Sequence, residues 1–224
     1  MSNTTIVKLQ VFKRFERMWH WSQMILIVTL IFTGFRVHGT HELISFNDAV
    51  TIHTWAAMIL LVIWSFATFW LFTTGEWRHY IPTGSNLFKV AKYYAFDIFK
   101  GEDHPYIKTF RRKHNPLQAL TYLMVKTVIF PAVWISGIAY LLLSFGLFDL
   151  VNLFGINCLE CIAIIHTIAA IAIVIFIIAH LYLLTTGHSF IDHVKPMITG
   201  YDDVELTDEE LAYLRQDELD RIQE

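Results

Sequence analysis

Four histidines lie within otherwise apolar segments, where an ionisable side chain is costly and therefore needs a reason: His20, His53, His166 and His180. His166 and His180 are 14 residues apart in the stretch IHTIAAIAIVIFIIAHLYLL. In an α-helix this is close to four turns, so both side chains share one face, about 21 Å apart along the axis. A single histidine on an apolar helix is usually a hydrogen-bonded core residue, whereas four at matched depths indicate paired ligands.

The segments that carry these histidines are long enough to cross a lipid bilayer. Hydrophobic residues make up 55% of the 224-residue chain and the mean hydropathy is +0.47, which is too apolar for a soluble domain of this length. A membrane helix needs about 20 mostly apolar residues, and four stretches meet this requirement. We predict an all-α integral membrane protein, a bundle of four transmembrane helices near residues 19–37, 50–73, 117–143 and 162–186.

Positive charge predicts how these helices are oriented. Lys and Arg residues gather in the N-terminal segment and in the loop between the second and third helices, whereas the first loop has only Arg36 and the third has none. Since positive loops stay in the cytoplasm, we predict that both termini and the middle loop are cytoplasmic. No cleavage site precedes the first apolar run, so we interpret it as a retained helix. The expected location is the plasma (inner) membrane of a prokaryote.

Two regions outside the spans have their own patterns. Between residues 87 and 99, apolar residues recur at helical spacing with lysines between them, which indicates an interfacial helix at the cytoplasmic membrane surface. An ordinary helix packed beneath the bundle is the alternative. Residues 201–224 hold ten Asp or Glu, which predicts a soluble acidic C-terminal tail, helical from Thr207, that is either a docking segment or a solvated end. We therefore divide the chain into a membrane domain, residues 1–200, and this tail.

The predicted orientation of the helices pairs the histidines. His20 and His180 are expected at one level near the cytoplasmic side, and His53 and His166 at another near the outer side. Paired imidazoles on facing helices are how a bundle core builds a cofactor site. Two axial histidines saturate a haem iron, which suits electron transfer and leaves no position for a substrate. We predict two haem b groups with these four histidines as iron ligands, and no catalytic residue; a haem-free membrane anchor is the alternative.

Small and basic residues lie where haem groups would need them. Gly34 and Ala67 each follow a predicted ligand histidine by 14 residues on the same helix face, and Gly137 lies in the outer half of the third helix. A residue with little or no side chain lets a flat ring approach the backbone, although small residues also serve close helix packing in membranes. Arginines near the helix ends are candidate partners of haem propionates or ordinary interface anchors: Arg14, Arg17 and Arg36.

Three further residues have open roles. Lys126, the one charge within the third helix, either snorkels to the cytoplasmic interface or pairs with a haem propionate or a quinone. Cys158 and Cys161 form a C-x-x-C followed by Ile162 rather than histidine, which excludes covalent c-type haem attachment. A disulfide, two free thiols or a partner contact all fit these cysteines, and we expect no catalytic role for them.

Four stretches, RMWHW, FTGF, KHNPLQALTYL and HTIAAIAIVIFIIAH, resemble the four-helix dihaem cytochrome b subunits of respiratory formate dehydrogenases, nickel-iron hydrogenases and thiosulfate-reductase-type molybdoenzymes. The resemblance covers about residues 14–200. It implies a subunit that relays electrons between a periplasmic iron–sulfur oxidoreductase partner and the quinone pool, with quinone as a mobile substrate. A stand-alone dihaem cytochrome that passes electrons between a periplasmic reductant and quinone is the alternative.

The resemblance also implies a quinone site near the cytoplasmic face, at the start of the third helix. Asn115 and Gln118 match the polar positions there and can donate hydrogen bonds to a quinone carbonyl without adding charge. His114 is a candidate proton carrier because histidine titrates near neutrality. Asn115 before Pro116 is also a strong helix N-cap signal, and the two roles are compatible. The implied partners are periplasm-facing catalytic subunits of hydrogenase, formate dehydrogenase or sulfur-compound reductase type, membrane lipid and quinone, with no nucleic acid.

Overall fold

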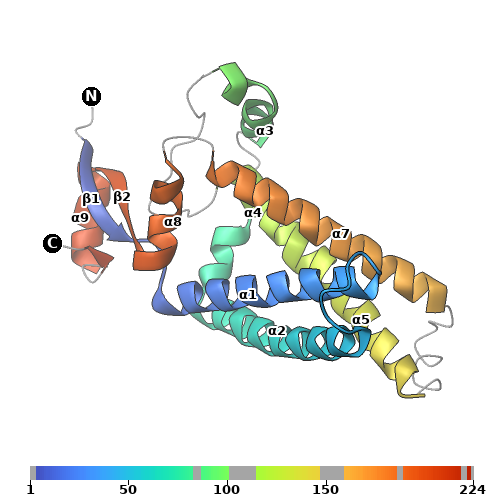
Figure 1. The fold of residues 1–224 in the computed structure, drawn as a ribbon. Helices are drawn as coiled ribbons and strands as arrows, with labels where there is room; N and C mark the ends of the chain where they lie inside the picture. Colours follow the sequence, from blue (N-terminus) through green and yellow to red (C-terminus); the bar gives the residue numbers. More distant parts are fainter. Residues whose placement is uncertain are drawn as a thin grey trace. The chain divides into compact units, whose positions relative to one another are not determined.

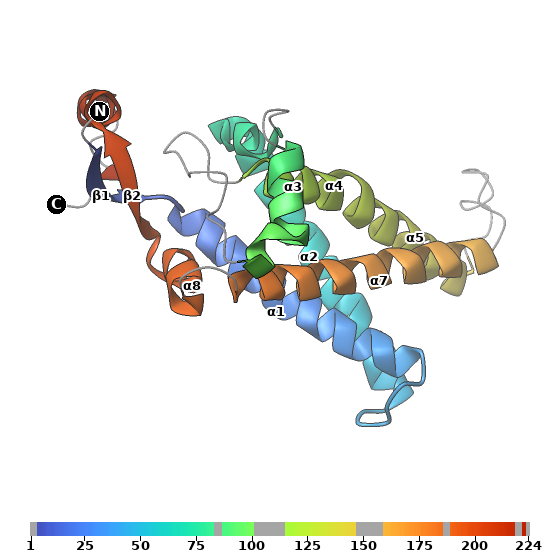
Figure 2. The same ribbon diagram turned by 90° about the horizontal axis from the view of Figure 1, so that it is seen from above.

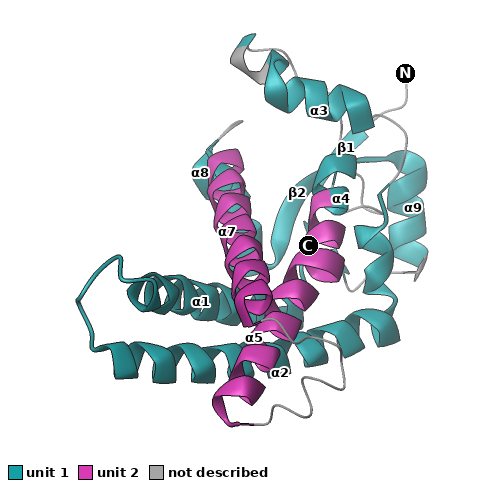
Figure 3. Ribbon diagram, turned by 90° about the vertical axis from the view of Figure 1, so that its right-hand side faces the viewer, with its two compact units in different colours: residues 1–120, 184–224 teal, residues 121–183 magenta. Residues whose placement is uncertain are grey.

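Helices dominate the computed structural model, which describes residues 4–82, 87–100, 115–146, 159–185, 189–217 and 221–222 (Figure 1, Figure 2). The chain divides into two compact units (Figure 3). The first unit contains residues 1–120 and 184–224, and the second contains residues 121–183. Each unit is built around a pair of long apolar helices.

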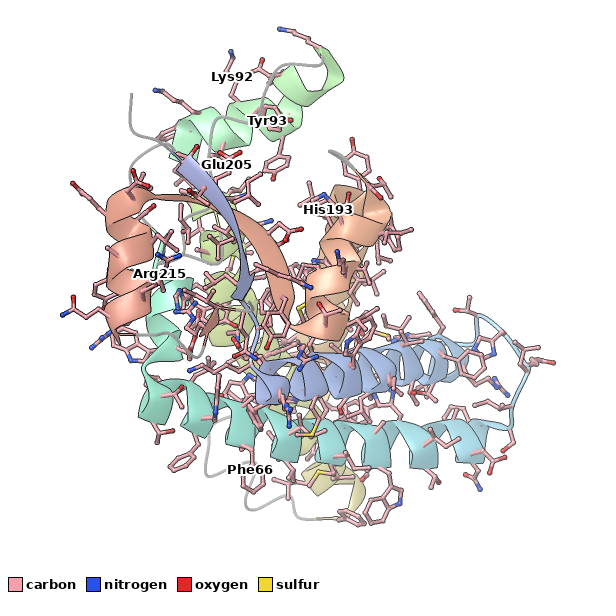
Figure 4. All side chains as sticks on the ribbon, turned by 90° about the vertical axis from the view of Figure 1, so that its left-hand side faces the viewer. Phe66, Lys92, Tyr93, His193, Glu205 and Arg215 are labelled. Atoms are coloured by element: carbon pink, nitrogen blue, oxygen red, sulfur yellow. The ribbon has the colours of Figure 1, made fainter. Side chains whose placement is uncertain are left out.

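Four helices among the described residues are long and apolar enough to cross a membrane: Arg14–Val37, Phe46–Thr74, Pro116–Ser144 and Leu159–Leu184. Large apolar side chains on these helices are exposed, as a surface that faces lipid requires. Phe66, for example, is 65% exposed and points away from its helix (Figure 4). These observations confirm the predicted four-span membrane protein. Its orientation across the bilayer stays a prediction.

The first unit contains an antiparallel hairpin of α1 (Arg14–Val37) and α2 (Phe46–Thr74). The rings of Phe15 and Trp70 lie 5.0 Å apart, so the start of α1 packs against the end of α2. One stripe of α2, mostly of small residues at spacings of seven and four, is buried: Ala49, Ala56, Leu60, Ala67 and Leu71. Small residues at such positions let helix backbones approach closely within a membrane.

Local signals mark the ends of these two helices. α2 begins after Ser45, whose hydroxyl accepts a hydrogen bond from the backbone N–H of Asp48 at 3.1 Å. It ends at Gly75, whose φ of +76° is the left-handed conformation that glycine adopts without strain. An ion pair of 2.9 Å between Lys13 and Glu76 joins the start of α1 to the residue that follows this glycine.

The second unit contains α5 (Phe130–Ser144) and α7 (Leu159–Leu184), which come together toward the end of α5 and the start of α7 (Figure 3). Ala139 and Ile162 are buried together and form the centre of their apolar contact. α7 is one continuous α-helix. It therefore carries the two histidines near its ends on a single rigid element.

The third span is not a uniform α-helix. α4 (Pro116–Met124) is followed by a π-helical segment, η3 (Val125–Ile129), before α5 begins. Pro131 stands in the first turn of α5, and in a regular helix its ring would clash with the carbonyl four residues earlier. The wider π turn relieves that clash. Tyr122 of α4 meets Phe176 of α7 edge-on with 6.0 Å between ring centroids, so the span contacts α7 on both sides of the π turn.

The acidic tail folds against the N-terminal segment in the first unit. β1 (Thr4–Gln10) lies beside β2 (Tyr201–Thr207) (Figure 2). The two strands pair antiparallel, with Val7 opposite Val204. The helix α9 (Asp208–Asp217) follows β2 directly and completes a small apolar core made of Leu9, Val204, Leu206 and Leu214. Neither strand is predicted from the sequence, because each is short and the pairing joins the two ends of the chain.

The predicted start of the tail helix is confirmed. Thr207 accepts a hydrogen bond from the N–H of Glu210 at 3.3 Å, and the Glu210 carboxylate accepts one from the N–H of Thr207 at 3.0 Å. This reciprocal pair is a capping box, and α9 begins at the next residue. The tail is not a detached segment, because its strand pairs with β1.

The helix α8 (Phe190–Thr199) precedes the tail and docks on the start of α1. The indole N–H of Trp21 donates to the carbonyl of Met197 at 2.9 Å and so satisfies one of the last carbonyls of α8. Gly200 ends α8 with a φ of +95°. Its own carbonyl accepts a hydrogen bond from the N–H of Val11 at 2.9 Å, which ties the end of α8 to the junction between β1 and α1.

The middle loop contains short helical elements: η1 (Glu76–Tyr80), α3 (Leu87–Ala95) and η2 (Asp97–Lys100). α3 has two contrasting faces, because Val90 is completely buried while Phe88 is 88% exposed. The predicted amphipathic helix is therefore present, although it ends at residue 95 rather than 99. Its place at the membrane surface stays a prediction.

Candidate functional site

In the first unit, His53 of α2 lies against the end of α1. Its Nδ1 atom is 2.9 Å from the hydroxyl oxygen of Thr33. A Cβ atom placed on Gly34 would lie 3.6 Å from the Cε1 atom of His53, an ordinary van der Waals contact. Thr33 is only 1% exposed, and its hydroxyl also lies 2.8 Å from the carbonyl oxygen of Thr29, one turn earlier. A buried hydroxyl of α1 thus contacts one edge of the His53 ring, and the following residue, Gly34, leaves open the space that a Cβ would fill beside it.

The second unit repeats this arrangement around His166 of α7. The Nδ1 atom of His166 is 3.1 Å from the hydroxyl of Ser136 and 3.1 Å from the carbonyl oxygen of Val133, both in α5. A Cβ atom placed on Gly137 would lie 3.2 Å from the Cε1 atom of His166, which is tighter than ordinary contact. The Ser136 hydroxyl is also within hydrogen-bond distance of the Ala132 carbonyl.

His20 of α1 and His180 of α7 each lie far along the helix axis from the histidine site already described in the same unit. Because α1 is helical from residue 14 to residue 37, His20 lies about 20 Å along its axis from Thr33, the residue that contacts His53. On α7, His166 and His180 are separated by about 21 Å. Each unit therefore presents two histidines at two levels, and the helical spacing predicted for His166 and His180 is confirmed.

Aromatic rings flank this second pair of histidines. The ring of Trp21 meets His20 edge-on with 5.4 Å between centroids. The ring of Phe176 lies nearly parallel to His180 with 5.9 Å between centroids. These contacts restrict the orientations that each imidazole can adopt on its own helix.

The histidine geometry within each unit fits axial ligation of haem. Both His53 and His166 turn Nδ1 toward the neighbouring helix, which leaves Nε2 as the nitrogen for a metal. A neutral imidazole nitrogen of this kind would serve as an axial ligand of a haem iron. The pairing of His20 with His180, and of His53 with His166, joins residues of different units and stays a prediction.

The small residues predicted to face haem have well-defined places in their own units. Gly34 and Gly137 each lie against the imidazole of a histidine on the adjacent helix, a contact that sequence spacing alone does not reveal. Ala67 is 1% exposed and belongs to the buried stripe of α2. Contact of these residues with a porphyrin ring stays a prediction.

Two of the three arginines predicted as partners of haem propionates, Arg17 and Arg36, hold segments of the chain together. The Arg17 guanidinium donates to the carbonyl of Ile198 near the end of α8. The Nε atom of Arg36 donates to the carbonyl of Ile44 at 2.7 Å, across the loop between α1 and α2. Each arginine therefore has a structural contact, and a role toward propionates stays a prediction.

The candidate quinone residues form the N-terminal cap of α4. The N–H of Gln118 donates to Oδ1 of Asn115 at 2.8 Å, and the N–H of Asn115 donates to Oε1 of Gln118 at 3.2 Å. This is a capping box, so the N-cap role of Asn115 before Pro116 is confirmed. The direct quinone contact of Asn115 and Gln118 stays a prediction, and His114 lies outside the described residues.

Tyr94 of α3 supports this cap from the middle loop. Its hydroxyl oxygen accepts a hydrogen bond of 3.2 Å from the side-chain amide of Asn115, which is only 5% exposed. Burial raises the pKa of Tyr94 above its ordinary value, so the phenol keeps its proton at physiological pH. The cap therefore ends in a neutral hydroxyl group.

The remaining residues of interest are Lys126 and the two cysteines of the C-x-x-C. Lys126 belongs to the π-helical segment η3, whose backbone is displaced from regular α-helix geometry. Cys161 is disulfide-bonded, which agrees with one of the three alternatives considered for the C-x-x-C, while Cys158 lies outside the described residues.

Two contacts around the histidines were not predicted. No role is assigned to Thr33 or to Ser136 from the sequence. The sequence does hold one feature that these two contacts share, because a hydroxyl residue directly precedes a glycine in Thr33-Gly34 and in Ser136-Gly137. Tyr94 has no such signal, since its contact joins α3 to the start of α4 across intervening residues.

A family model described as prokaryotic cytochrome b561 matches residues 11–200, nearly all of the chain before the acidic tail. The chain belongs to this family. As a prokaryotic cytochrome b561 it is a haem b protein of electron transport, with four apolar helices that make it a multi-pass protein of the inner membrane. The resemblance inferred from the motifs is thereby confirmed.

A curated relative agrees with this assignment. The Escherichia coli (strain K12) protein named "Putative cytochrome YdhU" is 29% identical over 212 residues, a match that covers 87% of this cytochrome and 74% of that protein. No solved structure matches the chain.

Proposed function

We propose that this cytochrome b is the membrane subunit of a respiratory oxidoreductase complex and relays electrons between a periplasm-facing iron–sulfur partner and the quinone pool. The observation that carries the proposal is the pair of histidines, about 20 Å apart along the helices, that each unit presents. Two sites at this separation cover most of a hydrocarbon layer that is about 30 Å thick. Each haem, when bound, supplies a carrier for one electron.

Two ligand pairs follow from the predicted orientation. The His20–His180 site lies toward the cytoplasmic side, and the His53–His166 site lies toward the outer side, because the basic segments stay in the cytoplasm. Two imidazoles occupy both axial positions of an iron, so neither site has room for a substrate ligand. The histidines therefore serve electron transfer, and chemistry on the oxidised or reduced substrate belongs to a partner subunit.

The quinone is proposed to bind near the cytoplasmic face, at the start of α4. Gln118 uses its side-chain oxygen in the capping box, so its amide nitrogen remains as a donor for a quinone carbonyl. Asn115 is held by Tyr94 and by the cap, which gives this end of the third span a rigid polar rim. His114 is the proposed proton carrier beside it.

Haem quantitation tests the relay. The purified membrane protein is expected to hold two b-haems per chain in a dithionite-reduced minus oxidised spectrum, and His166→Ala and His180→Ala are each expected to lose one. His41→Ala is the matched control, because the His41 ring stacks on Phe32 and is not one of the four proposed ligands. Unchanged haem content in both ligand variants would refute the proposal.

The same spectra test which histidines pair. His20→Ala is expected to abolish the same spectral component as His180→Ala, and His53→Ala the same one as His166→Ala. If His20→Ala instead abolished the component that His166→Ala removes, the predicted pairing of the histidines would be wrong. The proposal that the parent protein holds two haems would still stand.

The partner is proposed to be of hydrogenase type, since the name of the family model refers to nickel hydrogenase cytochrome b. Purification from native membranes in mild detergent is expected to recover a stoichiometric subunit with iron–sulfur clusters. Recovery of the cytochrome alone, still reducible through quinol, would favour a stand-alone cytochrome instead.

A further inference from the structure

Two buried hydroxyl groups contact the proposed ligands of one haem site. Thr33 of α1 contacts Nδ1 of His53, and Ser136 of α5 contacts Nδ1 of His166. In both units the hydroxyl residue stands on the helix next to the one that bears the histidine, and it directly precedes a glycine whose added Cβ would meet the same imidazole. This repetition in two separate helix pairs needs an explanation that applies to both.

The partners of His166 determine which atom carries the proton. A backbone carbonyl oxygen can only accept a hydrogen bond, so the 3.1 Å contact with Val133 requires a proton on Nδ1 of His166. The Ser136 hydroxyl lies at the same distance from Nδ1 and gives its own proton to the Ala132 carbonyl, so toward His166 it is an acceptor. The neutral ring is then left with a lone pair on Nε2.

The same reasoning applies to His53. The Thr33 hydroxyl has one proton, and the carbonyl of Thr29 at 2.8 Å is placed to receive it. The hydroxyl oxygen then accepts the Nδ1 proton of His53 at 2.9 Å. An iron bound at Nε2 requires this tautomer, because a neutral imidazole carries its proton on the other nitrogen.

We propose that Thr33 and Ser136 are positioning residues of the His53–His166 site: they orient both imidazoles, hold the proton on Nδ1 and lower the reduction potential of this haem. The proposal rests on the proposed function, since it takes these histidines as the axial ligands. An acceptor at Nδ1–H makes the ring a stronger electron donor through Nε2, and stronger donation stabilises ferric iron relative to ferrous iron. Loss of either acceptor therefore favours the ferrous state.

A simpler reading is that each hydroxyl only satisfies its own helix. Thr29 is an example of a hydroxyl that only satisfies its own helix, because it donates to the Ile25 carbonyl at 2.9 Å on an exposed part of α1. Thr33 and Ser136 differ from Thr29 in burial, at 1% and 4% exposed, and in contacting an imidazole. Thr29→Val is therefore a matched control for Thr33→Val, and Thr127→Val, whose hydroxyl bonds the Leu123 carbonyl, is one for Ser136→Ala.

Redox titration of the purified haem-loaded protein, followed in the visible spectrum, tests the proposal. The His53–His166 component is the one that His166→Ala removes. Thr33→Val is expected to raise the midpoint potential of that component only, because the ferrous form gains stability by about threefold to tenfold, the usual net worth of one hydrogen bond. At 59 mV per tenfold for one electron, this is about 30 to 60 mV. Ser136→Ala is expected to shift it in the same direction.

The conservative variant separates the hydrogen bond from packing. Thr33→Ser keeps the hydroxyl and is expected to restore the parent potential, and the ferric low-spin EPR signal of the same haem is expected to change in Thr33→Val only. A potential that stays unchanged in both Thr33→Val and Ser136→Ala would overturn the proposal while leaving the relay intact. An equal shift in Thr33→Ser would also overturn it. Retention of both haems in His166→Ala would instead refute the proposed function.

Discussion

The narrow space between Gly137 and the imidazole of His166 predicts how one added methyl group would perturb the His53–His166 site. In Gly137→Ala the new Cβ would lie 3.2 Å from Cε1 and 3.5 Å from Nδ1 of His166. Carbon atoms prefer a separation of about 3.5–4.0 Å, so the imidazole must retreat by roughly 0.3–0.5 Å. Its hydrogen bonds to Ser136 and Val133, both 3.1 Å long, would then approach the limit of about 3.5 Å at which such bonds are lost.

The size of the effect follows from the cost of overpacking. An inserted methyl group in a packed site typically costs about 1–3 kcal/mol, which corresponds to a loss of haem affinity of about 5- to 150-fold. Alanine also favours a helix over glycine by about 1 kcal/mol, a gain that applies to any glycine in these spans. Gly34→Ala is therefore the matched control, because its Cβ would lie at an ordinary 3.6 Å from His53.

The assay is haem retention in the His180→Ala background, in which the His53–His166 haem is the one expected to remain. The rate of haem transfer to an excess of apomyoglobin measures the loss of affinity, and thermal unfolding of each variant measures folding separately. Gly137→Ala is expected to lose haem much faster than Gly34→Ala. Equal retention in Gly137→Ala and the parent would refute the steric reasoning, whereas an equally fast loss in Gly34→Ala would indicate that the porphyrin itself contacts Gly34.

Three further predictions concern other parts of the chain. Leu206→Ala empties a fully buried position in the β1–β2–α9 core and is expected to lower the free energy of unfolding by about 2–5 kcal/mol. It is also expected to abolish hydrogen-exchange protection of the paired strands. Ile6→Ala, at a position 67% exposed, is the control and is expected to change that protection little. Asn115→Ala removes the cap of α4 and is expected to lower stability by about 0.5–2 kcal/mol in thermal unfolding, with Asn115→Asp retaining most of it; equal losses would argue against the cap. Lys126→Met is expected to leave both haem potentials and quinol turnover unchanged if the lysine snorkels, and a shift in either would assign it to a propionate or a quinone.

Features governed by short-range periodicity could be predicted well. The four spans follow from runs of about 20 apolar residues, and the levels of His166 and His180 follow from the fixed rise of one continuous helix. The caps at Asn115 and Thr207 were predictable for the same reason, because the donor and the acceptor are three residues apart. Each of these features is determined by neighbouring residues, so it can be predicted without knowing how distant parts of the chain pack.

Features that depend on the register between two elements could not be predicted. The contacts of Thr33 with His53, and of Ser136 with His166, depend on how two helices pack side by side. A shift of one residue would rotate a hydroxyl by about 100° away from the imidazole. The hydroxyl–glycine pairs are visible in the sequence, but nothing local indicates which histidine, if any, they meet.

The sequence by itself determined that this chain is a four-span membrane protein with two levels of histidines, because hydrophobicity and helical rise are local properties of each segment. Tertiary structure decided that β1 pairs with β2, since a strand of seven residues has no stable form until a partner from the other end of the chain satisfies its backbone. It also decided which nitrogen of His53 and His166 faces the neighbouring helix, because that depends on hydrogen-bond partners supplied by a different helix.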